Sequence, residues 1–149
     1  MALALFWAMR NAFTLPELML VLAVVGILVG IAIPSLSQAV NRIEVHAAAA
    51  HLIAAHQRAR MMAVVKGQVL TLAIDSAALS IAQRGSSTVL WTEPGPAASG
   101  VSLPGPTRRF TFAPEGFTLG LSNASLHLVR GAATRTVVFS RLGRVRLLP

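Results

Sequence analysis

The sequence predicts an α+β fold in which one long N-terminal helix packs on an antiparallel β-sheet domain. Three observations predict it. Residues 18–41 carry no charge. Residues 35–65 contain neither glycine nor proline and are rich in alanine, as a continuous helix requires. After Gly67 the apolar residues follow a period of two, and turn residues interrupt them at short intervals, which is typical of strands.

Composition narrows the class of protein. Of 149 residues, 54% are hydrophobic and 12% are charged, whereas roughly 25% would be charged in an ordinary soluble domain. The chain therefore fits one domain with a membrane segment and is not a disordered protein. It has no cysteine, which excludes a disulfide, a thiol nucleophile and a cysteine-ligated metal. The 13 Lys and Arg against 5 Asp and Glu indicate an anionic partner and leave few carboxylates for catalysis.

The first element is an apolar helix. Residues 18–33 are apolar throughout, and at about 1.5 Å per residue the uncharged run is long enough to cross a hydrocarbon core of about 30 Å. A buried core helix and a cleaved secretory signal are the alternatives. The unbroken apolar run does not suit the first in so small a domain, and its length and the preceding Glu17 do not suit the second.

The helix start is marked by a capping box. Thr14 stands at the N-cap, Pro16 in the first turn and Glu17 at the third helical position. A cap explains the spacing of these residues. It does not explain a carboxylate at the N-terminus of a membrane helix, where a charge is costly and marks a function.

Residues 12–19, Ala-Phe-Thr-Leu-Pro-Glu-Leu-Met, followed by the apolar run, resemble the class III signal of type IV pilins and type II secretion pseudopilins. The resemblance continues through residues 26–28 and 32–35. It implies that residues 1–12 are a leader, that a prepilin peptidase cuts between Ala12 and Phe13, and that Phe13 is then methylated. The family usually has Gly where this chain has Ala12. Because such leaders are short and basic, Met9 is an alternative start to Met1.

The resemblance also implies roles for residues of the span, 13–41. Glu17 is the membrane-buried acid, and the free amine of a neighbouring subunit's Phe13 can neutralise it. Gly26 and Gly30 form a small-residue pattern that permits close approach of helices. Pro34 is expected to kink or interrupt the helix near the membrane exit. We therefore assign these four residues to assembly with other pilins.

The implied location is the bacterial inner membrane. The chain would cross once, with its N-terminus in the cytoplasm and residues 42–149 in the periplasm, and it would stand at the tip of a pilus or pseudopilus when assembled. The few basic residues that flank the span do not favour this orientation, since Arg10 precedes it and Arg42, Arg58 and Arg60 follow it.

The helix is expected to continue over residues 42–66 and to end at Lys66 and Gly67. Two apolar stripes follow its length, which predicts contact with a sheet on one side and with neighbouring helices on the other. The first stripe is Leu36, Val40, Ile43, Ala47, Ala50 and Ala54; the second is Val45, Ala48, Leu52, Ala55, Ala59 and Met62.

Eight strands are predicted within residues 68–148, with turns between them at Gly, Asn, Asp and Ser. Residues 93–106 hold seven prolines and glycines and predict a long exposed loop. The predicted strands are residues 68–74, 79–83, 88–91, 109–112, 117–121, 126–130, 136–140 and 144–148.

Two further motifs narrow the resemblance. Phe112-x-Pro114-x-Gly116 and the ending Val138-Phe139-x-x-x-Gly143-Arg144-Val145-Arg146 are similar to the GspH and FimT group of minor pilins and pseudopilins. The group implies a pilin lollipop with a globular domain at 42–149, built into a type II secretion pseudopilus or a type IV pilus. In the FimT branch the terminal Gly-Arg-x-Arg is tied to DNA uptake.

The basic C-terminus has a physical basis for DNA binding as well. Arg144 and Arg146 project to one side of an extended segment, and Gly143 permits a tight turn and close approach of a phosphate. Such a cluster would hold double-stranded DNA through phosphates, without base specificity. A solvated strand face is the alternative. The DNA-binding candidates are Arg135, Arg141, Gly143, Arg144 and Arg146.

Catalysis and cofactors are not expected. His46, His51 and His56 are five residues apart, so each is rotated about 140° from the last, and polar positions on the helix suit them better than a metal site. The sequence has no nucleophile elbow and no P-loop. We predict a non-enzymatic subunit without metal or cofactor, whose partners are other pilins, the prepilin peptidase, the membrane and, in the alternative, DNA.

Overall fold

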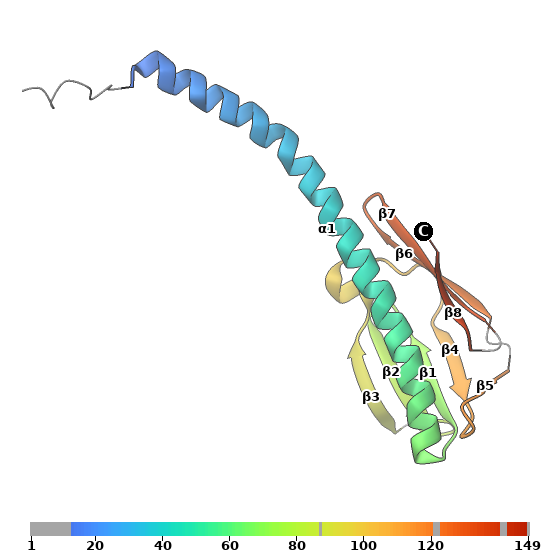
Figure 1. The fold of residues 1–149 in the computed structure, drawn as a ribbon. Coiled ribbons are helices and arrows are strands. Elements are labelled where there is room, and N and C mark those ends of the chain that lie inside the picture. The colour runs from blue at the N-terminus through green and yellow to red at the C-terminus, as the bar shows by residue number, and fades with distance from the viewer. Residues whose placement is uncertain (1–12, 87, 121–122, 141–142, 149) are drawn as a thin grey trace, which may run out of the picture. The chain divides into compact units, whose positions relative to one another are not determined.

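The computed structural model describes residues 13–86, 88–120, 123–140 and 143–148. In these residues a single α-helix, α1 (Leu15–Lys66), is followed by eight strands and a short 3-10 helix, η1 (Pro96–Ser99), as Figure 1 shows. The chain divides into two compact units, Met1–Ser37 and Gln38–Pro149. The predicted combination of one long N-terminal helix with an antiparallel sheet domain is confirmed.

The described part of the first unit is helical from Leu15 onward. Of the two outcomes predicted at Pro34, an interruption is wrong, because α1 continues through that position to Lys66. The alternative, a kink at Pro34, stays a prediction.

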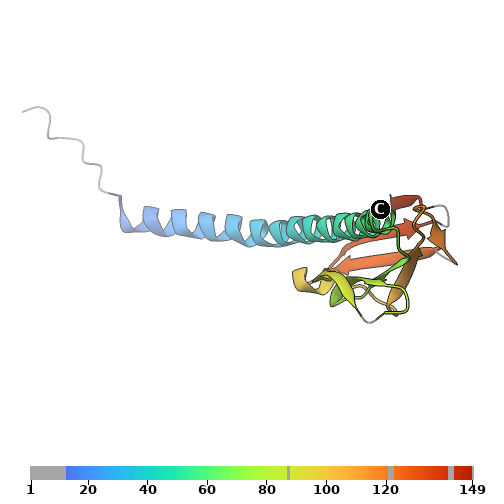
Figure 2. The same ribbon diagram turned by 90° about the horizontal axis from the view of Figure 1, so that it is seen from below.

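The second unit begins with residues 38–66 of α1, which contribute one helix face to the core. Figure 2 shows η1 and β1–β3 gathered on one side of this part of the helix. The buried face is the second predicted stripe, and its alanines let the helix lie close to the sheet. The first stripe is exposed from Val40 to Ala54. The buried apolar residues are Val45, Ala48, Ala49, Leu52, Ala55, Ala59 and Ala63, and His56 is buried with them.

The end of α1 is the predicted one. Gly67 has φ +60° and donates its N–H to the Val64 carbonyl at 3.2 Å, and Gln68 donates to the Ala63 carbonyl at 3.2 Å. This pair of bonds is a Schellman motif, which needs a left-handed residue after the last helical turn.

Five strands form an antiparallel sheet in the order β3-β2-β1-β4-β5. Its centre, β1, alternates between buried and half-buried residues, so Leu70, Leu72 and Ile74 enter the core. Across from them Phe112 pairs with Leu70 and Phe110 with Leu72. The strands are β1 (Leu70–Ile74), β2 (Ala78–Gln83), β3 (Val89–Pro94), β4 (Arg108–Phe112) and β5 (Thr118–Leu119).

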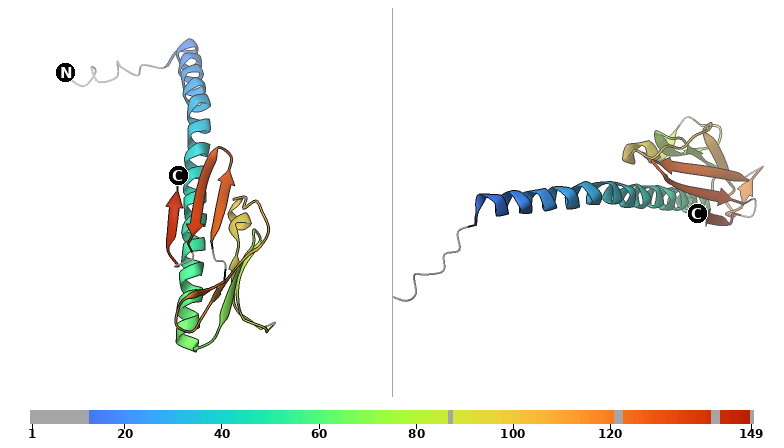
Figure 3. Two further views of the ribbon diagram at one scale, coloured as in Figure 1. Left: turned by 90° about the vertical axis from the view of Figure 1, so that its right-hand side faces the viewer. Right: turned by 90° about the horizontal axis from the view of Figure 1, so that it is seen from above.

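Three more strands form a second antiparallel sheet in the order β6-β7-β8, with β8 at one edge (Figure 3, left). They are β6 (Ala124–Arg130), β7 (Ala133–Phe139) and β8 (Val145–Leu148). Val137 and Phe139 are buried with Leu126 and Leu128, which defines the inner face of this sheet. All eight predicted strands are present, and the ends that lie in described residues either coincide with the predicted ones or differ from them by up to three residues.

The prediction of a long exposed loop at residues 93–106 is wrong. This segment contains η1 and a bridge from Ser102 to Val129. Val101 is buried, and Gly95 lies so close to β2 that a Cβ there would meet the Ser76 carbonyl oxygen at 2.4 Å. The prolines and glycines here shape a packed segment, so their number alone did not indicate exposure.

Candidate functional site

The N-terminal segment places Thr14 directly before Leu15, the first helical residue, which is the N-cap position that the sequence predicts. Phe13 and Thr14 precede α1, and Leu18 donates its N–H to the Thr14 carbonyl at 3.1 Å, so that Glu17 is the third helical residue. The Phe13 side chain is 76% exposed. Ala12, on the other side of the expected cut, lies outside the described residues.

The first unit presents apolar side chains that nothing in the described chain covers. By length and composition α1 can cross a membrane, and it is the one such helix among the described residues. Apart from the adjoining residues and backbone of α1 itself, no described atom lies within 4 Å of the place where a Cβ on Gly26 or Gly30 would stand, so these surfaces are open to a second helix. Glu17 is exposed and makes no ion pair with the described residues. The exposed apolar residues include Leu18, Leu20, Leu22, Val25, Ile27, Leu28 and Ile31.

The second sheet brings two of the predicted arginines together. Arg146 pairs with Val138, whose side chain lies opposite the core, and Arg144 stands two residues earlier on the same side. Both arginines are exposed. Together with Val138 and Ser140 they line a shallow groove of about 340 Å³. We call this side of the β6–β8 sheet the outer face.

The turn before Arg144 is fixed by Gly143. This residue has φ +74° and donates its N–H to the Ser140 carbonyl at 2.9 Å, while Ser140 donates to the Arg144 carbonyl at 2.8 Å. The Arg144 N–H reaches the Ser140 hydroxyl oxygen at 3.2 Å. The hairpin therefore holds the backbone of Arg144 in place. Arg141 lies outside the described residues.

Arg135 is not part of this cluster. It shares the inner face with Val137 and Phe139, because alternate residues of β7 point to the same side. There it lines a different concavity, together with Arg42 and Val45 of α1. The expected grouping of Arg135 with Arg144 and Arg146 is therefore wrong, since sequence proximity does not determine the face of a strand.

Arg130 also lies on the inner face, where it has structural partners. Its Nη1 donates to the Ser99 carbonyl and lies 3.8 Å from Oε2 of Glu44. These contacts join β6 to η1 and α1.

His56 corrects the expectation that the three helix histidines are polar surface positions. It is 2% exposed and stands among three phenylalanine rings, with ring centroids 5.7 Å from Phe110, 5.0 Å from Phe112 and 4.9 Å from Phe139. Burial, with a smaller contribution from the Arg60 charge, lowers the pKa of His56 from 6.5 to about 4. The imidazole is therefore neutral at pH 7 and serves as a core ring.

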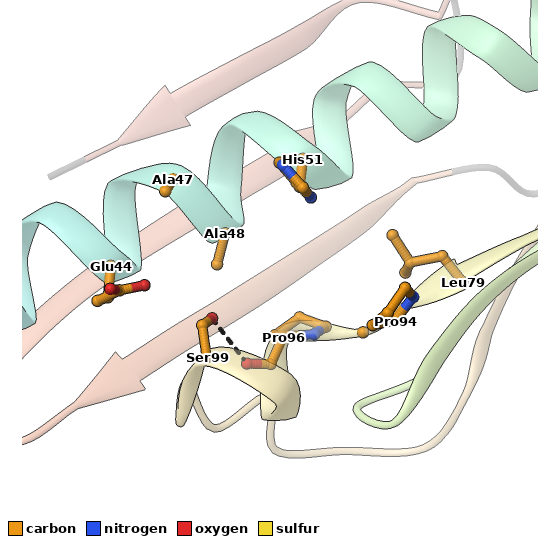
Figure 4. Close-up of a pocket in the computed structure, with 9 residues that line it drawn as sticks. Glu44, Ala47, Ala48, His51, Leu79, Pro94, Pro96 and Ser99 are labelled. Carbon is orange, nitrogen blue, oxygen red and sulfur yellow. Dashed lines mark hydrogen bonds between the residues drawn. The ribbon is translucent and has the colours of Figure 1, made fainter.

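His46 and His51 are exposed. His51 lines a groove of about 180 Å³ between α1 and the η1 segment, where Ala48 and His51 project toward Pro96 and Pro94 (Figure 4). The Ser99 hydroxyl donates to the Pro96 carbonyl at 3.1 Å. The remaining lining is mostly Ala, Leu and Pro, and in the described part of the chain no three His, Cys, Asp or Glu converge as metal ligands. This groove suits contact with a side chain better than catalysis.

Sequence reasoning used Arg42 only to judge orientation, yet the structure places it beside Arg135. The available signal was its position as the first charged residue after the uncharged run. Its partner on β7 could not be found without the register of the β6–β7 hairpin.

An exposed apolar helix that begins directly after Phe13 and Thr14, in the same chain as two antiparallel sheets, defines a pilin-type subunit. Residues 48–143 match the family model for type II transport protein GspH, and residues 7–33 match the prokaryotic N-terminal methylation motif. The chain belongs to the GspH family.

Individual proteins agree with that assignment. The chain is 32% identical over 161 residues to the pilin-like protein PilA1 of Thermus thermophilus, covering 93% of this chain and 98% of PilA1. It shares its fold with the type IV minor pilin FimU of Pseudomonas aeruginosa. One FimU crystal structure aligns with a TM-score of 0.57 at 23% identity, over 72% of this chain and 90% of FimU. A second crystal form gives 0.54 at 21% identity, over 70% and 92%.

Proposed function

We propose that the chain is a minor pilin or pseudopilin that is cut before Phe13, held in the inner membrane by the first half of α1, and then built into a type IV pilus or type II secretion pseudopilus. The observation that carries this proposal is the exposed apolar surface of the first unit. At its start stands Glu17, which has no ion-pair partner among the described residues. Such a surface needs lipid before assembly and other helices after it.

The fibre itself supplies the test. Fibres sheared from cells that express a tagged chain should contain the chain, and the membrane fraction should hold the remainder. Recovery of the chain in the soluble periplasm alone would contradict the proposal, because the apolar surface of α1 would then contact neither lipid nor the helices of other subunits.

A second function is favoured by one specific observation, the outer-face pair Arg144 and Arg146. The strands of this sheet carry no Asp or Glu, and the sequence has no acid after Glu115. The two guanidinium groups form no ion pair with described residues, and beside a shallow groove each can bind a phosphate oxygen of double-stranded DNA. In this proposal the pilin binds DNA through its backbone and without base specificity.

DNA binding is expected to fall steeply with salt. Since each neutralised phosphate contributes about −0.9 to the slope of log affinity against log salt, the double variant Arg144→Gln/Arg146→Gln should reduce the magnitude of that slope by about 2. The measurement is a titration of duplex DNA into the full chain in detergent at several salt concentrations.

Arg42→Gln/Arg135→Gln is the matched control, because it removes the same charge from the inner face. Equal losses of DNA affinity in the two double variants would show that net charge alone causes the effect, and would refute a site at Arg144 and Arg146. Absence of binding by the unaltered chain at low salt would reject the DNA function itself.

A further inference from the structure

The inner face holds a second pair of arginines that the proposed functions do not use. Arg42 of α1 and Arg135 of β7 line one concavity of about 340 Å³, with Thr134 and Val45 also in its wall. A smaller concavity of about 40 Å³ is lined in part by Arg42 and extends this region to Gln38 and Asn41. We call the region formed by Gln38, Asn41, Arg42, Thr134 and Arg135 the arginine pocket.

The β6–β7 turn holds the two sides of the arginine pocket together. Arg130 pairs with Ala133 across a two-residue turn, and Gly131 in this turn has φ +57°. A Cβ on Gly131 would lie 2.7 Å from the Asn41 side-chain nitrogen, so the turn stands directly against α1. This contact brings the start of β7, and with it Arg135, beside Arg42. The pocket therefore follows from the fold and does not depend on flexible side chains alone.

Within the described part of the chain, no carboxylate forms an ion pair in the arginine pocket. The nearest acid along α1 is Glu44, which is paired with Arg130 at 3.8 Å. Arg135 donates to the Thr134 carbonyl at 3.4 Å, a neutral partner, and neither Arg42 nor Arg135 forms an ion pair among the described residues. Two positive charges thus line one concavity, and none of the described residues places an anion beside them.

The position of Arg42 in the sequence indicates which anion is available. It is the first charged residue after residues 18–41, which carry no charge. A helix with its uncharged part in the hydrocarbon core brings its next charged residue to the headgroup layer. There the phosphate groups of phospholipids are the most concentrated anions, and guanidinium groups bind phosphate with two parallel hydrogen bonds.

We propose that Arg42 and Arg135 bind the phosphate of an anionic phospholipid headgroup while the subunit is in the membrane, before it enters a fibre. This proposal rests on the membrane anchoring proposed above. A bound headgroup would set how far α1 enters the bilayer and would hold Arg42 and Arg135 at the lipid surface. Release into a fibre would then require the pocket to exchange lipid phosphate for another partner.

The test uses the full chain inserted into nanodiscs of phosphatidylcholine with roughly 20 mol% phosphatidylglycerol, so that the anionic lipid is the minority. The lipids that the chain retains after mild detergent extraction are counted by native mass spectrometry. The unaltered chain should retain phosphatidylglycerol in preference to phosphatidylcholine. At about fivefold per arginine near the surface, Arg42→Gln/Arg135→Gln should lower that preference by up to roughly 30-fold.

Arg144→Gln/Arg146→Gln carries the same change of net charge on the outer face and should keep the preference. Equal losses in both double variants would overturn the proposal, because net charge would then explain retention. Displacement of the lipid by 10 mM inorganic phosphate, about a hundredfold above the chain's concentration, would assign the pocket to free phosphate and refute the headgroup.

Whether the chain inserts into nanodiscs distinguishes a failure of the lipid-binding proposal from a failure of the proposed membrane anchoring. A chain that does not enter nanodiscs contradicts the membrane span. A chain that enters them and shows no preference for phosphatidylglycerol contradicts only the arginine pocket. Thermal unfolding of the two double variants, compared with that of the unaltered chain, should show that the head remains folded in each.

Discussion

Replacing Glu17 with Gln is expected to lower the amount of the chain in sheared fibres by at least about tenfold, relative to the amount in the membrane. The carboxylate is exposed and makes no ion pair with the residues that the structure describes. In a fibre it would lie among apolar helices, where the free amine of a neighbouring subunit's Phe13 is the proposed partner. Loss of one member of a buried ion pair leaves the other charge unpaired, at a cost of about 3–5 kcal/mol.

Glu115→Gln is the matched control for Glu17→Gln. Glu115 is an exposed residue of the head, so its replacement removes the same charge without touching the first unit. Glu17→Asp, which keeps the charge, should recover part of the incorporation. Wild-type amounts of the Glu17→Gln chain in the fibre would contradict the proposed pairing.

Acid is expected to destabilise the head through His56. Its pKa is about 4 in the folded chain and 6.5 without the fold, so between these values the unfolded chain binds a proton that the folded chain does not. Stability is therefore complete above pH 6.5 and falls as the pH is lowered toward 4, by about 3 kcal/mol in total. Urea unfolding of the mature chain in detergent, followed by Trp91 fluorescence, measures this loss.

The comparison with His51 isolates the buried imidazole. His56→Leu places an apolar side chain among Phe110, Phe112 and Phe139 and should flatten the dependence of stability on pH between 6.5 and 4. His51→Leu, on the exposed side of the same helix, should leave it unchanged. An unaltered pH dependence in His56→Leu would show that other groups cause the acid loss.

The sequence predicts those parts of the fold that depend on local pattern. Continuous helix formers and the Lys66-Gly67 end mark α1, and alternation marks the strands, because each pattern is set by residues a few positions apart. The ring environment of His56 could not be predicted. Its neighbours come from β4 and β7, more than fifty residues away in the chain.

The same distinction holds for the arginines. Arg144 and Arg146 are two residues apart in one strand, so their common side follows from strand geometry alone. The place of Arg135 depends on the register of β6 against β7 and on the contact of the Gly131 turn with Asn41. Neither can be read from composition, and both are needed to recognise that Arg135 belongs with Arg42.

The mass of the N-terminal peptide, measured on the chain recovered from membranes, shows whether this protein is a processed pilin subunit whose mature chain begins at Phe13. In cells with an active prepilin peptidase, we expect a peptide that starts at Phe13 and carries one methyl group. A chain recovered only with residues 1–12, or with residues 9–12, still attached would contradict it.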